Sequence, residues 1–268
     1  MILRQSSLQL LNHRSSVQNK KVCPQESRYL AVFPASRPLG VRNRILDALP
    51  HEELARLLPF LEKVDLKKGE IVYITGDDIK YVYFPENGLL SLVSITETGS
   101  PMEVAMVGNE GGVGLPVILR DHMIPYDVTA QFTTNALKIK AKALQEEFDK
   151  GQTLHEFVLR YLSVLIAQIS QGSICNRFHF REQAFRRWLL TVQDRVNSDS
   201  LDLTQENISN ALGIPMTAVT KAAATMQRDG LIRYSRGKII ILERAKLETD
   251  SCECYHIIRD QLRHFLNK

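Results

Sequence analysis

The segment 203–242 constrains this chain more than any other, because its residues follow the order of a helix-turn-helix and a two-stranded hairpin. Thr204 suits the cap of a first helix, Gly213 the turn after it, and Pro215 the start of a second helix. Arg236-Gly237 then favours a tight turn between two short strands. These local signals together predict a winged helix-turn-helix.

The second helix of this unit is predicted to bind DNA. Its inner face carries small or apolar side chains that would pack on the first helix, and its outer face carries side chains suited to base edges, methyl groups and phosphates. A basic pair at the hairpin tip would contact the DNA backbone. The alternative is an αα-hairpin and a β-hairpin that pack for stability alone. The predicted DNA-binding residues are Thr204, Gln205, Met216, Thr217, Thr220, Lys221, Arg236 and Lys238.

The charge distribution separates this region from the middle of the chain. Residues 41–152 contain 12 Lys and Arg against 17 Asp and Glu, whereas residues 173–244 contain 11 against 7. At 268 residues the chain exceeds the usual size of one domain, which favours two. An acidic middle and a basic C-terminal region fit a sensor module joined to a nucleic-acid-binding module.

The segments before the helix-turn-helix predict a tail and a β-barrel. Residues 1–40 are rich in Ser and basic residues, which predicts a disordered tail, with a transit peptide or a misplaced start codon as alternatives. Regularly spaced turn formers between β-branched and aromatic runs predict an antiparallel jelly-roll barrel over residues 41–150. The fold class is therefore α+β.

A long helix is predicted over residues 151–175. Its stripe of Val158, Leu162, Leu165 and Ile169 suits pairing with a second copy of the helix, or else packing on its own barrel. We expect the DNA-binding domain over residues 176–250 and a C-terminal tail over 251–268. Because the sequence contains no run of about 18 apolar residues, we expect no membrane-spanning segment.

These features together resemble the Crp/Fnr family of bacterial transcription regulators. Barrel, long helix and winged helix-turn-helix follow the family's order, and the segments 175–190, 194–196 and 252–255 are similar to one large subgroup. The resemblance implies a cyclic-nucleotide-binding-like barrel and a cytoplasmic homodimer that binds a palindromic operator and contacts RNA polymerase. The alternative is an effector- or partner-binding barrel whose degenerate C-terminal domain acts through protein contacts.

Relatives with Crp-like operators carry Arg-Glu early and Arg later on the second helix. The matching positions here are Met216, Thr217 and Lys221, so two of the three polar groups that pair with guanine and cytosine are missing. A thioether or a threonine methyl group favours contact with thymine. We therefore expect a half-site different from the Crp-like one.

The family's cyclic-nucleotide cassette is incomplete in this sequence. The resemblance implies a Gly-Glu pair for the ribose and an Arg-Ser or Arg-Thr pair for the phosphate, whose buried charge needs a partner. Here Val113 follows Gly112, and Pro125-Tyr126-Asp127 occupy the phosphate position. A looped alignment could bring in Arg120 instead. Neither His122 nor His155 has the context of a haem ligand. The sequence therefore indicates neither a cyclic nucleotide nor haem as the effector.

The four cysteines raise a separate question. An iron-sulfur cluster in such relatives needs three cysteines near the N-terminus, where this chain has Cys23 alone. Cys252 and Cys254, with His256 nearby, could bind zinc or copper or act as a thiol switch, which would make a thiol- or metal-responsive regulator. This set lacks a fourth ligand, and the favoured alternative is a partly buried helix end whose cysteines pack as small apolar side chains. We therefore expect no metal and no cofactor.

An enzyme is not expected from this sequence. It contains no Gly-rich phosphate loop, no nucleophile elbow and no His-Glu-x-x-His motif. The run 111–114 is glycine-rich, but the βαβ context of a dinucleotide-binding site is absent around it.

We predict that cyclic AMP does not regulate this protein. A phosphate at the position of Asp127 would face a carboxylate, and an uncompensated buried charge costs several kcal/mol. Each ~1.4 kcal/mol weakens binding tenfold. Calorimetry at millimolar cyclic AMP and cyclic GMP should show no saturable binding, and neither nucleotide should change DNA binding. Micromolar binding that alters DNA affinity would contradict the alignment and indicate Arg120 as the phosphate partner.

Overall fold

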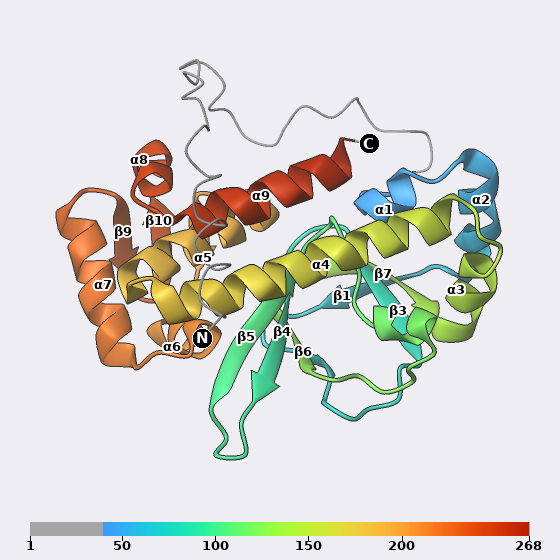
Figure 1. The fold of residues 1–268 in the computed structure, drawn as a ribbon, viewed down its shortest axis with the longest axis horizontal. Coiled ribbons are helices and arrows are strands. Elements are labelled where there is room, and N and C mark those ends of the chain that lie inside the picture. Colours follow the sequence, from blue (N-terminus) through green and yellow to red (C-terminus); the bar gives the residue numbers. More distant parts are fainter. Residues whose placement is uncertain (1–39, 268) are drawn as a thin grey trace, which may run out of the picture. The chain divides into compact units, whose positions relative to one another are not determined.

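The computed structural model describes residues 40–267, which begin with short helices and an antiparallel barrel (Figure 1). The predicted tail, except for its last residue, lies outside the described residues, as does Lys268. The elements up to the barrel's end are α1 (Arg44–Asp47), α2 (His51–Leu57), η1 (Leu58–Phe60), β1 (Glu62–Leu66), β2 (Ile71–Tyr73), β3 (Tyr81–Pro85), β4 (Leu89–Ile95), β5 (Pro101–Val107), η2 (Leu115–Leu119), β6 (Asp127–Phe132), β7 (Thr134–Lys140) and α3 (Ala141–Phe148).

The barrel consists of two sheets. One has the strand order β1-β7-β3 and the other β2-β6-β4-β5, with antiparallel pairing throughout. Strand β6 alternates between half-buried and buried residues: Val128 and Ala130 lie in the barrel core, and Phe132 packs with residues of the C-terminal domain. Gly88 forms the turn between β3 and β4 at φ 71°, where a Cβ would lie 2.4 Å from the Thr134 hydroxyl oxygen. The predicted jelly-roll barrel is thus confirmed.

The long helix α4 (Thr153–Phe178) has two apolar faces. One face packs on the barrel through Leu154, Val158, Tyr161, Leu165 and Gln168, which are all buried. The prediction that Val158 and Leu165 pair with a second copy is therefore wrong, because both belong to the barrel core. The other face, displaced by one residue, carries the exposed Leu159 and Ile166 and the half-buried Leu162 and Ile169.

Helix α4 is also long and apolar enough to cross a membrane by length and composition alone. Its mean hydropathy is 1.2 over 18 residues, of which 22% are buried. The helix is not a continuous apolar run, because Arg160 and several Ser and Gln residues interrupt it, and the expectation of no membrane-spanning segment stays a prediction. One apolar face of α4 is covered by the barrel, and the other is exposed in the described part of the chain.

The remainder of the chain forms the winged helix-turn-helix and two further helices. Residues 251–268 were expected to form a tail, but they include a helix whose Tyr255, Ile258, Leu262 and Phe265 are buried, because their spacing places them on one face. Phe265 packs on Phe157 of α4 at 6.0 Å between ring centroids. The elements are α5 (Arg181–Val196), β8 (Ser200–Asp202), α6 (Gln205–Leu212), α7 (Met216–Arg228), β9 (Ile232–Ser235), β10 (Lys238–Ile241), α8 (Arg244–Thr249) and α9 (Glu253–Leu266).

A buried ion pair joins the barrel to α5. The Arg195 Nε lies 2.8 Å from the Glu110 Oε1, and each side chain is only 5% exposed. Arg195 also donates to the Gln168 side-chain oxygen of α4 at 3.0 Å, and Gln168 donates to the Met106 carbonyl of β5 at 3.1 Å. One network thus connects the barrel, the long helix and the C-terminal domain.

A second contact between β5 and α5 lies close by. The Trp188 indole N–H donates to the Glu103 carboxylate at 2.7 Å, and the Ser91 hydroxyl donates to the same carboxylate. Burial raises the pKa of Glu103, which favours its neutral form. This second contact joins β5 to α5 through a carboxyl group that carries less charge than the ion pair of Arg195 and Glu110.

Arg195→Ala should strongly destabilise the protein. Removing one partner leaves the Glu110 charge buried and uncompensated, which typically costs about 3 to 5 kcal/mol of the free energy of unfolding. Urea denaturation followed by circular dichroism measures this loss. The matched control is Arg120→Ala, which breaks an exposed ion pair to Asp149 and should cost less than about 1 kcal/mol. Equal losses of unfolding free energy in the two variants would show that the buried ion pair stabilises the protein no more than the exposed one.

Candidate nucleic-acid interface

Helices α6 and α7 form the predicted helix-turn-helix. The Thr204 hydroxyl caps α6 by accepting from the Asn207 N–H at 3.1 Å, and the Asn207 side-chain oxygen accepts from the Thr204 N–H at 3.0 Å. Gly213 ends α6 in the left-handed region at φ 60°, and Pro215 is the N-cap of α7. Because the Thr204 hydroxyl is bonded within the protein, its first role is that of a helix cap.

Helix α7 separates a buried face from an exposed face. The buried residues are Val219, Ala222, Ala223 and Met226. Met216 is 53% exposed, and Thr217 and Lys221 are exposed on the same side of the helix. The Thr220 hydroxyl donates to the Gln205 side chain of α6 at 3.0 Å, so this pair joins the two helices at their exposed edge.

The wing is a two-residue hairpin of β9 and β10. Arg236 and Gly237 have φ of 50° and 74°, as a tight hairpin turn requires at both central positions. Ser235 pairs with Lys238 across the turn, and both cations at the tip are exposed. The Gln227 side chain of α7 accepts from the Tyr234 N–H at 2.7 Å and so attaches the wing to the helix.

The predicted residues therefore form two neighbouring groups. Met216, Thr217 and Lys221 lie at the N-terminal part of α7, and a groove of about 320 Å³ joins the wing to the start of α6. Among residues 40–267, no acidic residue forms an ion pair with Lys221, Arg236 or Lys238. Their charges are therefore available to phosphates. The residues that line the groove are Thr204, Gln205, Tyr234, Ser235, Arg236 and Gly237.

The region of the barrel that would hold a cyclic nucleotide is packed against its own chain. A Cβ at Gly111 would lie 2.0 Å from the Tyr161 ring of α4. Val113 is 1% exposed and forms an antiparallel bridge with Tyr83. Burial of the Tyr126 phenol raises its pKa to about 12.

The charged residues of the cassette face other partners. Arg120 points to Asp149, with 2.8 Å between the guanidinium and the carboxylate, and its side chain is 63% exposed. Asp127 accepts from the backbone N–H and the hydroxyl of Thr75, both at 2.8 Å. Arg120 and Asp127 are thus each bonded to other residues of the described part of the chain.

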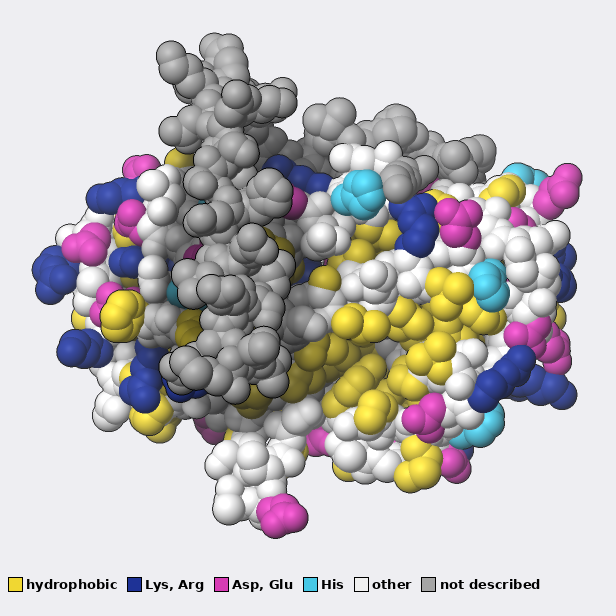
Figure 2. Space-filling view, in the orientation of Figure 1, with side chains coloured by type: hydrophobic (Ala, Val, Ile, Leu, Met, Phe, Trp, Pro, Cys, Tyr) yellow, Lys and Arg dark blue, Asp and Glu magenta, His cyan; other side chains and the backbone are white. Residues whose placement is uncertain are grey.

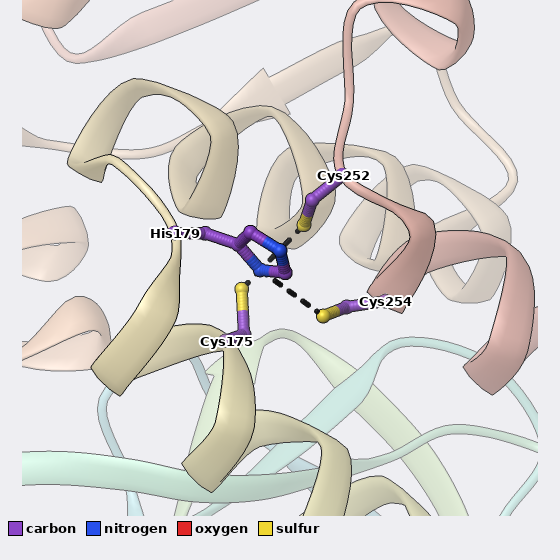
Figure 3. Close-up of side chains that lie close together, drawn as sticks. All are labelled: Cys175, His179, Cys252 and Cys254. Carbon is purple, nitrogen blue, oxygen red and sulfur yellow. Dashed lines mark hydrogen bonds between the residues drawn. The ribbon is translucent and has the colours of Figure 1, made fainter. Parts of the chain in front are cut away.

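The Cys252 and Cys254 thiols lie beside Cys175 and His179, a grouping that sequence reasoning missed (Figure 3). His256 is not part of it, since its ring packs against Tyr255. A hydrogen bond from Cys252 lowers the pKa of Cys175, while burial raises the pKa of Cys254. The one available signal was the Cys-x3-His spacing of Cys175 and His179, which places both near one face of a helix end.

Two family models match this chain. A model of the cyclic nucleotide-binding domain matches residues 63–150, and a model of the Crp-like helix-turn-helix domain matches residues 185–249. Together the matches span more than half of the 268 residues.

Similar proteins cover most of the chain. The transcriptional activator protein Anr of Pseudomonas aeruginosa is 23% identical over 224 residues, covering 81% of this chain and 88% of Anr. The transcriptional activator protein FnrL of Cereibacter sphaeroides is 24% identical over 222 residues, covering 77% and 88%.

Solved structures show the same fold. The structure of FixK2 from Bradyrhizobium japonicum has a TM-score of 0.63 at 14% identity, covering 72% of this chain and 98% of FixK2. A regulator of the crp/fnr family from Eubacterium rectale has a TM-score of 0.62 at 19% identity, covering 77% and 96%.

Proposed function

Since the chain belongs to the Crp/Fnr family of transcription regulators, we propose that it binds a palindromic DNA operator as a homodimer. The observation that carries this proposal is the exposed face of α7 next to a basic wing. Helix α7 would lie in the major groove, with Met216, Thr217 and Lys221 toward the base edges. Arg236 and Lys238 of the wing would contact the DNA backbone.

The exposed apolar face of α4 supports the homodimer. Leu159, Leu162, Ile166 and Ile169 follow one another at three, four and three residues, as the seam of two paired helices requires. Leu159 is 42% and Ile166 is 63% exposed. Figure 2 shows hydrophobic side chains gathered along α4 and the neighbouring barrel. Two-fold pairing through this face would present two α7 helices to the two halves of a palindrome.

The remaining parts of the proposal rest on the family. A regulator of this type acts in the cytoplasm, contacts RNA polymerase and has no catalytic activity. Its barrel would sense an effector whose identity is unknown. The network of Arg195, Glu110 and Gln168 would transmit a change in the barrel to the DNA-binding domain, because it contacts both.

DNA binding should depend on three cations, Lys221, Arg236 and Lys238. Each neutralised phosphate or base contact is typically worth about 1 to 3 kcal/mol, so replacing all three with Ala should abolish a gel shift on the DNA flanking the gene. Thermal unfolding should not change, because all three side chains are exposed. Any residual binding should depend less steeply on salt.

The control variant removes the same charge from the barrel. Lys63→Ala, Lys80→Ala and Lys140→Ala together leave the C-terminal domain untouched, and these side chains are also exposed. This variant should bind DNA like the wild type. A folded Lys221, Arg236 and Lys238 variant with undiminished binding would refute the proposed interface.

A further inference from the structure

Four side chains with metal-binding atoms converge where α4 ends and α9 begins (Figure 3). Cys175 lies in the last turn of α4, and His179 is its C-cap. Cys252 is the N-cap of α9, and Cys254 lies in its first turn. The three sulfurs and one imidazole nitrogen all lie within 4.8 Å of one another, although the two cysteine-containing segments are more than 70 residues apart.

Two of the separations between ligand atoms are close to those of a tetrahedral metal site. Bonds of about 2.3 Å to sulfur and 2.0 Å to nitrogen imply about 3.8 Å between two sulfurs and about 3.6 Å between sulfur and nitrogen. The Cys175 and Cys252 sulfurs lie 3.6 Å apart, and the Cys254 sulfur lies 3.3 Å from the His179 Nδ1. The sulfur separation is far longer than the ~2.05 Å of a disulfide.

We propose that Cys175, His179, Cys252 and Cys254 bind one Zn²⁺ ion in a closed structural site. Three sulfurs and one imidazole form a ligand set typical of structural zinc, and four protein ligands leave no open position for a substrate. The three cysteines are at most 2% exposed, which protects the site from solvent. The geometry does not depend on the proposed DNA binding.

Neighbouring groups orient the ligands as they do around known metal sites. Glu253 Oε1 lies 3.2 Å from the His179 Nε2, so a proton held there leaves the Nδ1 lone pair free for the metal. The Gln171 side-chain amide donates to the Cys254 sulfur at 3.1 Å. A carboxylate on the second imidazole nitrogen and an N–H donor on a sulfur are features that simple packing of small apolar side chains does not require.

The surroundings also compensate the charge of the site. Three thiolates and one Zn²⁺ carry a net charge of −1, which lies at the positive N-terminal end of the 14-residue helix α9. Arg187 of α5 is 8% exposed, and its Nε has no hydrogen-bond partner among the described residues. Arg187 is one turn from Ala184, which packs in the cysteine cluster. Arg187 also interacts with Glu103, so an anionic zinc centre would add to the compensation of this buried cation.

The ion would connect the end of the long helix α4 to the start of the C-terminal helix α9. It would fasten α9 to the end of α4, directly before the connection at Phe180 to α5. Any effect of zinc on DNA binding would follow from fixing this connection, and that part rests on the proposed function. Metal content and stability test the site independently of DNA.

The full chain, purified under reducing conditions, should contain one zinc per chain by mass spectrometry of the metal. After a chelator removes the zinc, Co²⁺ alone should restore one equivalent, with visible bands of tetrahedral geometry and a near-ultraviolet band from thiolate ligation. Added Zn²⁺ should then displace the bound Co²⁺. Removal of zinc should lower the midpoint of thermal unfolding, and its return should restore it.

Variants separate the proposed ligands from neighbouring residues. Cys175→Ser, Cys252→Ser and Cys254→Ser should each lose stoichiometric zinc, whereas Cys23→Ser and His256→Ala should keep it. Since a ligand variant can fail to fold, Glu253→Ala gives a milder test and should weaken zinc binding by about 10- to 100-fold in a chelator competition.

Two outcomes would overturn the proposal. One is a reduced, folded wild-type chain that takes up neither zinc nor cobalt. The other is a chain that is metal-free as purified and holds a Cys175 to Cys252 disulfide, which re-forms after reduction when an added disulfide takes up the two electrons and two protons and becomes two thiols. That result would identify a redox pair in place of a zinc site. Unchanged DNA binding after zinc removal would contradict only the link to the α4–α5 connection.

Discussion

The buried pair of Arg195 and Glu110 is the contact on which the arrangement of this protein depends. Two charges that are each 5% exposed are tolerated only when their hydrogen bonds are complete, because desolvation costs several kcal/mol for each ion. Gln168 of α4 supplies one of the remaining partners, and the backbone N–H of Gly108 supplies another. The pair therefore favours the observed relation between barrel, long helix and C-terminal domain, since burying one of the two charges without the other would cost several kcal/mol.

Helix α4 follows from the same constraint. Gln168 must face the junction, so the residues on its side of the helix, such as Val158 and Leu165, enter the barrel core. The neighbouring stripe through Leu159 and Ile166 is left exposed and available to a second copy. The barrel core and the proposed dimer seam thus share one helix, so a shift of the helix against the barrel would move residues on both of its faces.

The C-terminal helix α9 packs against both α5 and α4. The Tyr255 hydroxyl donates to Asp194 at 3.0 Å, and Arg244 forms an ion pair with the same carboxylate at 2.6 Å. Phe265 at the far end packs on α4. With the proposed zinc ion at its start, α9 would be attached to the long helix at both ends and to α5 between them. The segments that resemble one subgroup of the family therefore meet at a single place in the fold.

What the sequence determined by itself is local. The Thr204 cap, the Gly213 turn and the Arg236-Gly237 hairpin could all be predicted, because each depends on backbone angles and hydrogen bonds within a few residues. The DNA contacts and the domain limits stay predictions.

Only the tertiary structure decided which stripe of α4 faces the barrel, that Glu110 meets Arg195 85 positions away, and that Cys175 and His179 join Cys252 and Cys254. Helical periodicity marks two adjacent apolar stripes equally well, and pairs so distant along the chain meet only after separate elements have packed.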